Sequence, residues 1–168
     1  RLINTQEMDI PSYTANASNR CYYCKSELYG QLRRLAEHEG YEWVADGFNA
    51  DDEGDYRPGV QAGRENAVRS PLKEASLTKT DIRAIAQELD LPVWNKPALA
   101  CLSSRVAYGI EVTEERLRQV EQAEVLLRAE GFHELRVRHH ETVARIEVPA
   151  SEQSRLIEDE ARRQRIVE

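Results

Sequence analysis

Three cysteines are the residues of this chain whose types and spacing point most directly to chemistry. Cys21 and Cys24 form a Cys-x-x-Cys pair in the stretch NRCYYCKSELY, and Cys101 stands alone much later, in PALACLSSR. Thiolates act as nucleophiles, as redox couples, or as ligands of zinc and iron. A chemistry that uses all three thiols must bring the distant one to the neighbouring pair.

From the residues alone, several interpretations of the cysteines stay open. A thioredoxin-like dithiol usually has small residues or proline between its cysteines, whereas this pair encloses Tyr22 and Tyr23. A structural zinc site needs a fourth ligand, which only a distant histidine or acid could supply. An iron-sulfur cluster held by three thiolates leaves one iron open for chemistry. Two unrelated buried cysteines would also produce the Cys-x-x-Cys spacing.

Two polar loops carry further candidates. The loop GFNADDEGDYRPG follows an expected strand and holds Asp51, Asp52, Glu53 and Asp55 beside Arg57. Such a loop is either a solvated acidic surface or part of a ligand site, because ligands of open α/β sheets bind at the carboxyl ends of strands.

The second polar loop is CLSSR, which combines the Cys101 thiol with Ser104 and Arg105. Hydroxyl and guanidinium groups suit an anion or an activated acyl group. The alternative interpretation of this loop is a polar turn without a ligand.

The second half of the chain offers an acid and an arginine pair. Glu124 interrupts the apolar stripe of an expected helix, and a buried acid needs a partner or a ligand. Arg136, Arg138 and His140 share one face of an expected strand, where two arginines could hold a phosphate. The alternative for these arginines is a solvent-exposed strand face balanced by Glu147.

Composition limits the classes of protein to consider. The chain has 168 residues, of which 40% are apolar and 32% charged, as in ordinary globular proteins. It contains no apolar run long enough to span a membrane, so we expect no membrane association. Sparse cysteines in an odd number favour a reducing, cytoplasmic location. The formal net charge of −7 makes nucleic acid an unfavourable partner.

The pattern of apolar, capping and turn residues in the first half of the chain predicts an α/β fragment. Residues 1–18 look like a connecting segment. A helix is expected over residues 21–38, capped by Asn19 or Ser18 and ended by Gly40. Residues 42–46 read as a strand, followed by an irregular loop. Thr78 and Asp81 form a capping box for a helix over residues 79–89, with an inward apolar face comprising Ile82, Ile85, Ala86 and Leu89.

The second half predicts an α-β-β-α arrangement. Thr113 caps a helix that ends at Gly131, and HELRVRHH and VARIEV alternate as a hairpin that turns near Glu141. Ser151 opens a last helix. We therefore divide the chain into domains at residues 1–109 and 110–168. One strand cannot form a parallel sheet, so its partners are expected upstream of Arg1.

Four motifs in order, NRCYYCKSELY, DGFNADDEGDYRPG, VRSPLKEASLTKTDIR and KPALACLSSRVAYG, resemble those of the LarE family. The resemblance runs from about Thr14 to about Val148. It implies an α/β fold, a doubly wound parallel sheet of the PP-loop type, whose N-terminal part is missing from this chain, with a second, smaller α+β domain. The chain departs from the family in having Phe48 where threonine is expected, and in lacking the SGGxDS phosphate-binding loop.

The resemblance also implies an activity. Members of the LarE family use ATP to adenylylate carboxylates of a pyridinium dicarboxylate mononucleotide and then replace AMP with sulfur. Some members sacrifice the sulfur of a single cysteine and are left with dehydroalanine. Others hold a [4Fe-4S] cluster with three cysteines, and the present chain resembles this second type. The resemblance further implies ATP with Mg²⁺ and a homo-oligomer.

Carried over residue by residue, the resemblance makes Cys21, Cys24 and Cys101 the cluster ligands. It implies that the adenylylation site is lined by Lys25, Asp51, Asp52 and Arg57. Ser104 and Arg105 would contact the substrate near the thiol, with Glu124 as a nearby acid. Arg136 and Arg138 would bind the substrate phosphate. Two alternatives stay open, a PP-loop tRNA thiolase with an iron-sulfur cluster and a non-catalytic zinc or iron-sulfur binding module.

Overall fold

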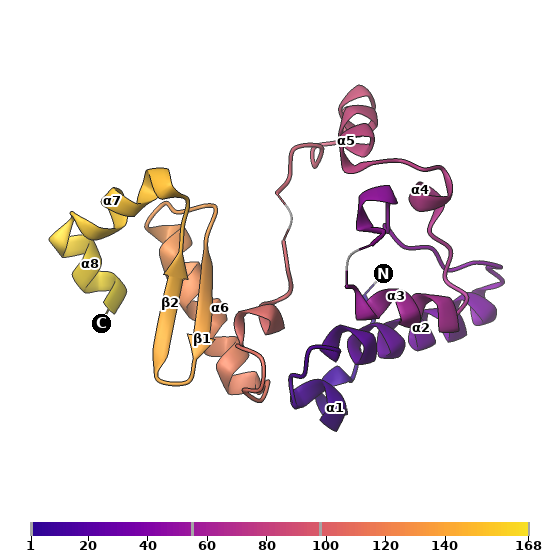
Figure 1. The fold of residues 1–168 in the computed structure, drawn as a ribbon, viewed down its shortest axis with the longest axis horizontal. Coiled ribbons are helices and arrows are strands. Elements are labelled where there is room, and N and C mark those ends of the chain that lie inside the picture. Colours follow the sequence, from indigo (N-terminus) through magenta and orange to yellow (C-terminus); the bar gives the residue numbers. More distant parts are fainter. Residues whose placement is uncertain (1, 55, 98, 168) are drawn as a thin grey trace. The chain divides into compact units, whose positions relative to one another are not determined.

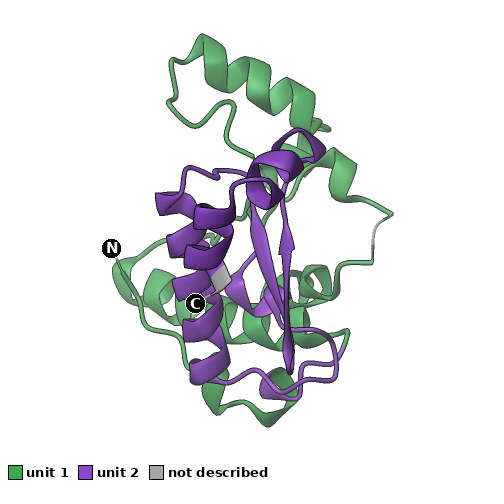
Figure 2. Ribbon diagram, turned by 90° about the vertical axis from the view of Figure 1, so that its left-hand side faces the viewer, with its two compact units in different colours: residues 1–13, 18–99 green, residues 14–17, 100–168 purple. Residues whose placement is uncertain are grey.

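A computed structural model of the chain describes residues 2–54, 56–97 and 99–167, so Asp55 of the acidic loop lies outside the described residues. The chain forms two compact units, which Figure 2 colours separately. Unit 1 comprises residues 1–13 and 18–99, and unit 2 comprises residues 14–17 and 100–168. The domain division expected between residues 109 and 110 stays a prediction.

The fold mixes helices with one small sheet (Figure 1). In unit 1 the helices are α1 (Pro11–Thr14), α2 (Arg20–Glu39), α3 (Pro58–Glu65), α4 (Pro71–Glu74) and α5 (Lys79–Glu88). Unit 2 contains α6 (Glu114–Ala129), β1 (Arg136–His140), β2 (Val143–Glu147), α7 (Gln153–Ile157) and α8 (Glu160–Val167). Short 3₁₀ turns cover Glu7–Asp9, Ala50–Asp52, Leu102–Arg105 and Ala150–Glu152. In the described part of the chain, the named strands form only this two-stranded sheet, so the doubly wound sheet stays a prediction.

Helix α2 confirms the longest expected element. It ends at Gly40, whose φ of +77° is the left-handed conformation that glycine adopts without a steric penalty. Asn19 occupies the N-cap position, as expected, but its side chain makes no capping hydrogen bond. Among the described elements of unit 1, α2 packs mainly against α3. Gly59 permits this approach, because a β-carbon there would lie 2.9 Å from Lys25 Cγ.

The strand expected over residues 42–46 is reduced to one parallel bridge, between Ala45 and Arg69. The Asp46 amide donates to the Arg69 carbonyl at 2.9 Å, and the Arg69 amide donates to the Val44 carbonyl at 2.8 Å. A strand needs a longer ladder than this pair of bonds supplies.

The loop after residue 46 is more regular than expected. Asn49 caps the 3₁₀ turn Ala50–Asp52 through a capping box, and Pro58 begins α3 in the first helical position, where its missing N–H costs nothing. Residues 1–18, expected to be a connecting segment, likewise contain a 3₁₀ turn and α1.

Helix α5 forms with the capping box of Thr78 and Asp81, as expected. The prediction that Ile85 and Leu89 face inward is wrong, because both side chains are exposed. The capping box satisfies backbone groups locally, so the helix can form without burying its whole apolar face. No described helix is long and apolar enough to cross a membrane.

Unit 2 follows the expected α-β-β-α order, with its last helix divided into α7 and α8. The Thr113 side chain accepts a hydrogen bond from the Arg116 amide at 3.2 Å and caps α6. Strands β1 and β2 pair antiparallel, with Val137 opposite Ile146, and Glu141 takes a φ of +53° in the turn.

The core of unit 2 lies between α6 and the hairpin. Its buried members are Leu127, Phe132, Leu135 and Val137. Helix α6 contributes Leu127 from its apolar stripe, and β1 contributes Val137, which lies on the face opposite Arg136 and Arg138. The guanidinium of Arg155 stacks on the Phe132 ring, with its central carbon 4.7 Å from the ring centroid.

Asn16 attaches residues 14–17 to unit 2. It is fully buried, takes a left-handed φ of +55°, and its side-chain amide donates to three backbone carbonyls. The carbonyls of Ala107 and Ile110 each accept at 2.8 Å. Asparagine tolerates this conformation better than most residues do. A short polar stretch thereby fixes the loop that follows the CLSSR motif.

Two neighbouring leucines test the core of unit 2. Leu127 is 1% exposed, whereas Leu126 is 39% exposed. We expect Leu127→Ala to lower the free energy of unfolding by about 2–5 kcal/mol, because it leaves a cavity. Leu126→Ala should cost less than about 1 kcal/mol. Urea denaturation followed by circular dichroism measures both, and equal losses would contradict this assignment of the core.

Candidate functional site

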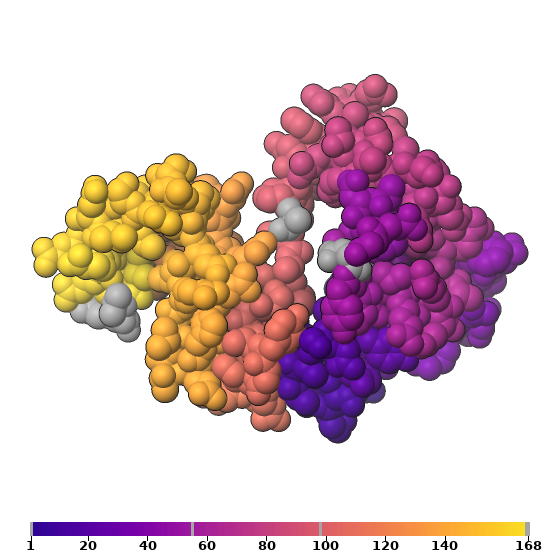
Figure 3. Space-filling model, in the orientation of Figure 1, coloured from indigo at the N-terminus to yellow at the C-terminus, as the bar shows by residue number. Residues whose placement is uncertain are grey.

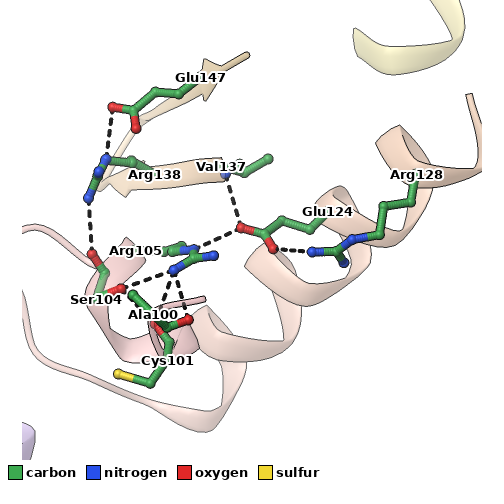
Figure 4. Close-up of polar contacts among 9 residues, drawn as sticks. All are labelled: Ala100, Cys101, Ser104, Arg105, Glu124, Arg128, Val137, Arg138 and Glu147. Atoms are coloured by element: carbon green, nitrogen blue, oxygen red, sulfur yellow. Dashed lines mark hydrogen bonds and ion pairs between the residues drawn. The ribbon is translucent and has the colours of Figure 1, made fainter. Parts of the chain in front are cut away.

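A buried ion pair lies at the centre of unit 2. Arg105 Nε donates to Glu124 Oε1 at 2.9 Å, and the two side chains are 3% and 2% exposed (Figure 4). Arg105 comes from the CLSSR motif, while Glu124 projects from α6. A buried charge is costly unless it is paired, so each residue depends on the other.

Arg105 also holds the backbone around Cys101. Its Nη1 donates to the Ala100 carbonyl at 3.0 Å and to the Ser104 hydroxyl oxygen at 3.1 Å, with a longer contact of 3.4 Å to the Cys101 carbonyl. The Ser104 hydroxyl in turn donates to the Cys101 carbonyl at 2.6 Å. We call residues 100–105 the cysteine turn. Its shape is set by the guanidinium beneath it, while Cys101 itself is exposed.

Glu124 is satisfied by three donors. Besides Arg105, Arg128 donates through Nη2 at 2.8 Å, and the Val137 amide donates at 3.2 Å. Burial raises the pKa of Glu124, but the hydrogen bonds from Arg105, Val137 and Arg128 outweigh burial and leave the pKa below its ordinary value. Glu124 is therefore an ionised anchor that joins α6, β1 and the cysteine turn.

Arg138 connects the hairpin to the cysteine turn. Its Nη1 donates to the Ser104 carbonyl at 3.2 Å, and its Nε donates to Glu147 at 2.8 Å (Figure 4). Arg136 begins the same strand and is exposed. The face expected for phosphate binding thus lies directly beside the turn that carries the Cys101 thiol.

Most of the residues expected near the thiol chemistry come together in unit 2. Cys101, Ser104, Arg105, Glu124 and Arg138 form one chain of contacts. The contacts of Arg105 and Glu124 are with protein groups, so their direct contact with a substrate stays a prediction. Sequence reasoning missed Arg128 in this network. Its position four residues after Glu124 on a helix was the available signal.

The remaining candidates belong to unit 1. Cys21 is exposed and Cys24 half-buried in the early turns of α2, and none of the three cysteines forms a disulfide. Tyr22, between the pair, donates from its hydroxyl to Glu65 of α3 at 2.6 Å and meets Tyr23 edge to face. Tyr22, inside the Cys-x-x-Cys pair, therefore links α2 to α3.

The expected adenylylation residues make contacts within unit 1. Asp51 accepts a hydrogen bond from the Lys79 amide at 2.7 Å, and Asp52 pairs with Arg57 at 2.7 Å. Lys25 Nζ lies 5.1 Å from the centroid of the Tyr29 ring. Their contacts with ATP stay a prediction.

The donor chemistry of the three cysteines suits an iron-sulfur cluster, since each is a thiol outside any disulfide and two lie one helical turn apart. Within the described residues, no group of three His, Cys, Asp or Glu side chains is close enough together to hold a metal ion. Cys21 and Cys24 belong to unit 1 and Cys101 to unit 2. The cluster therefore stays a prediction.

Comparison with known proteins identifies relatives with similar sequences, although no family model matches the chain. It is 50% identical over 158 residues to an uncharacterised protein of Synechocystis, covering 94% of this chain. It is 46% identical over 134 residues, 80% of its length, to the pyridinium-3,5-bisthiocarboxylic acid mononucleotide synthase of Lactiplantibacillus plantarum. An uncharacterised protein of Methanocaldococcus jannaschii is 33% identical over 146 residues, 87% of this chain.

The matched region covers 59%, 49% and 57% of these three relatives, so the chain spans about half the length of the proteins it matches. The similarity to the synthase supports the resemblance to the LarE family that the four motifs indicated.

Replacing the buried acid tests the anchor in unit 2. Glu124→Gln leaves the Arg105 charge without its counter-ion, so we expect a loss of about 3–5 kcal/mol in the free energy of unfolding at neutral pH. Because the pKa of Glu124 is lowered on folding, its stabilisation is present above the unfolded pKa and is lost as pH falls through the folded pKa. The difference between native and variant protein should therefore shrink on acidification below about pH 4.

The control is Glu121→Gln on the same helix, where the side chain is exposed. Thermal or urea unfolding between neutral and acidic pH measures both variants. A Glu124→Gln protein as stable as the Glu121→Gln protein would refute the anchor.

Proposed function

We propose that this chain is part of an ATP-dependent sulfur transferase of the LarE family, with a PP-loop type α/β domain and a smaller α+β domain. The reaction converts carboxylates of a pyridinium dicarboxylate mononucleotide into thiocarboxylates. The contact between Arg138 and the Ser104 carbonyl, at 3.2 Å, carries the proposal. It puts a guanidinium suited to a phosphate beside the turn of an exposed thiol, in a chain with 46% identity to a thiocarboxylate-forming synthase.

The reaction has two steps. A substrate carboxylate oxygen attacks the α-phosphorus of Mg²⁺-bound ATP, and pyrophosphate leaves. A sulfur nucleophile then attacks the activated carbonyl carbon, and AMP leaves with the electrons of the broken carbon–oxygen bond. Adenylylation makes the carboxylate oxygen a leaving group, which a free carboxylate lacks.

The residues of unit 1 serve the first step in this proposal. Lys25 and Arg57 neutralise phosphate charge, while Asp51 and Asp52 provide the oxygen ligands that Mg²⁺ prefers. Both acids already sit in capped, hydrogen-bonded positions, Asp51 on the Lys79 amide and Asp52 on Arg57. Their carboxylates are thus held in place before a nucleotide arrives.

The residues of unit 2 position the substrate for the second step. Arg136 and Arg138 bind its phosphate by charge-assisted hydrogen bonds. Ser104 and Arg105 shape the cysteine turn that presents Cys101, and Glu124 keeps Arg105 in place. Cys21, Cys24 and Cys101 are the residues that would hold a [4Fe-4S] cluster, which when bound supplies a replaceable sulfide.

The arginine pair gives the first test of this function. Arg136→Ala and Arg138→Ala, made in the full-length protein, should each weaken binding of the mononucleotide about ten- to a hundredfold, because each removes a charge-assisted hydrogen bond to the phosphate. ATP binding should stay nearly unchanged, because ATP is assigned to residues of unit 1. Calorimetric titration of both ligands measures this. Equal weakening of both would indicate a folding defect and would contradict the assignment.

The cysteines give the second test. Full-length protein reconstituted anaerobically should bind about four irons per chain. Substituting alanine for any one of Cys21, Cys24 or Cys101 should abolish the cluster absorbance, whereas Tyr23→Phe between the pair should leave it intact.

Iron content and intact mass after reaction with sulfide are the readouts for the cysteine test. Stoichiometric zinc without iron would exclude the cluster. Conversion of Cys101 to dehydroalanine, seen in the intact mass as the loss of H₂S, would show the sacrificial mechanism instead.

A further inference from the structure

Glu147 carries a carboxylate that the sequence assigned only as a counter-charge, yet it sits on the proposed phosphate-binding arginine. Its Oε1 accepts from Arg138 Nε at 2.8 Å and from Arg145 Nη2 at 2.9 Å. One oxygen is therefore shared by two guanidinium groups. The hydrogen bond from Arg138 is the first cause of the lowered pKa of Glu147.

The register of the hairpin explains this arrangement. Arg138 lies directly opposite Arg145, and Arg136 lies opposite Glu147. Residues paired across an antiparallel ladder share one face, and two arginines directly opposite one another repel. Glu147 offsets that repulsion in a face that otherwise carries three guanidinium groups.

We propose that Glu147 is a resident anion that occupies Arg138 until the substrate phosphate displaces it, and that Arg145 sets the strength of this competition by holding Glu147. The inference deepens the proposed function and rests on it, because it assumes that the phosphate binds at Arg136 and Arg138. It makes Glu147 and Arg145 residues that tune substrate affinity.

The exposure of the pair permits such an exchange. The Arg138 and Glu147 side chains are 27% and 35% exposed, and the hairpin reaches the molecular surface in Figure 3. Partly exposed ion pairs contribute little net stability, so an incoming anion can replace one partner. The Arg105–Glu124 pair, by contrast, is enclosed and cannot exchange without leaving a buried charge.

The geometry also preserves the contact with the cysteine turn during exchange. Arg138 uses Nη1 for the Ser104 carbonyl and Nε for Glu147, which are separate donors of one planar group. A phosphate that takes over the position of Glu147 can leave the Ser104 contact in place. The phosphate would then be fixed relative to the thiol-bearing turn.

Glu147→Gln in the full-length protein tests the competition. The probe is nicotinic acid mononucleotide, a pyridinium carboxylate with a 5′-phosphate, and the reference ligand is nicotinic acid riboside, which lacks the phosphate. We expect the variant to bind the mononucleotide about three- to tenfold more tightly, as expected for removing a competing ion pair. Binding of the riboside should change less than about twofold.

The matched control is Glu141→Gln, the same charge change at an exposed position in the turn of the same hairpin. It should leave both affinities unchanged if proximity to Arg138, rather than net charge, causes the effect. Equal tightening in the two variants would overturn the proposal.

A double-mutant cycle tests the role of Arg145. Arg145→Ala removes one of the two arginines that bind Glu147, so Glu147 pairs more strongly with Arg138. We therefore expect mononucleotide affinity to fall about three- to tenfold. In the Glu147→Gln background the same substitution should cost less than about twofold, because the competing anion is gone. An equal cost in both backgrounds would mean that Arg145 contacts the phosphate itself, and it would overturn the proposal.

Arg138→Ala separates the two levels of inference. If Arg138→Ala does not weaken mononucleotide binding, the phosphate site of the proposed function is wrong. If Arg138→Ala weakens binding but Glu147→Gln does not strengthen it, the phosphate site stands and the competition by Glu147 is wrong.

Discussion

The buried pair of Arg105 and Glu124 is the interaction on which unit 2 depends. Through Arg105 it holds the carbonyls and the hydroxyl of the cysteine turn, and through Glu124 it receives the Val137 amide of β1. A helix, a strand and a turn that lie apart in sequence thereby share one ionic centre. The apolar contacts of Leu127 and Val137 pack α6 against the hairpin, but the ion pair fixes where the thiol lies.

Two kinds of ion pair divide the work in the proposed site. The enclosed pair cannot be broken without isolating a charge in the protein interior, so it serves to position groups. The Arg138–Glu147 pair is partly solvated and shared with Arg145, so its partners can be exchanged at small cost. A site that must hold a thiol rigidly and accept an anion reversibly needs both.

Hydrogen bonds to the Asp46 carboxylate connect separate segments of unit 1. Asp46 accepts from the Tyr29 hydroxyl at 2.9 Å, from the Ser70 hydroxyl at 2.8 Å and from the Phe48 amide at 3.1 Å. These bonds connect α2, the acidic loop and the residue before α4. The pKa of Tyr29 is raised by burial and by its hydrogen bond to Asp46, because both favour the protonated hydroxyl that donates this bond.

The sequence by itself determined the helices with strong local signals, namely α2 with Gly40, α5 with its capping box and α6 with Thr113, because these signals act within a few residues. It also proposed the candidate site residues, and it predicted the hairpin that β1 and β2 form. Only the tertiary structure decided that Glu124 faces Arg105, that Asn16 joins unit 2, and that Glu147 sits on Arg138. The residues of each contact come from separate elements, and no local sequence pattern determines which polar or charged side chains will pair. The strand expected over residues 42–46 shows the same limit, since a strand exists only where a neighbour completes its ladder.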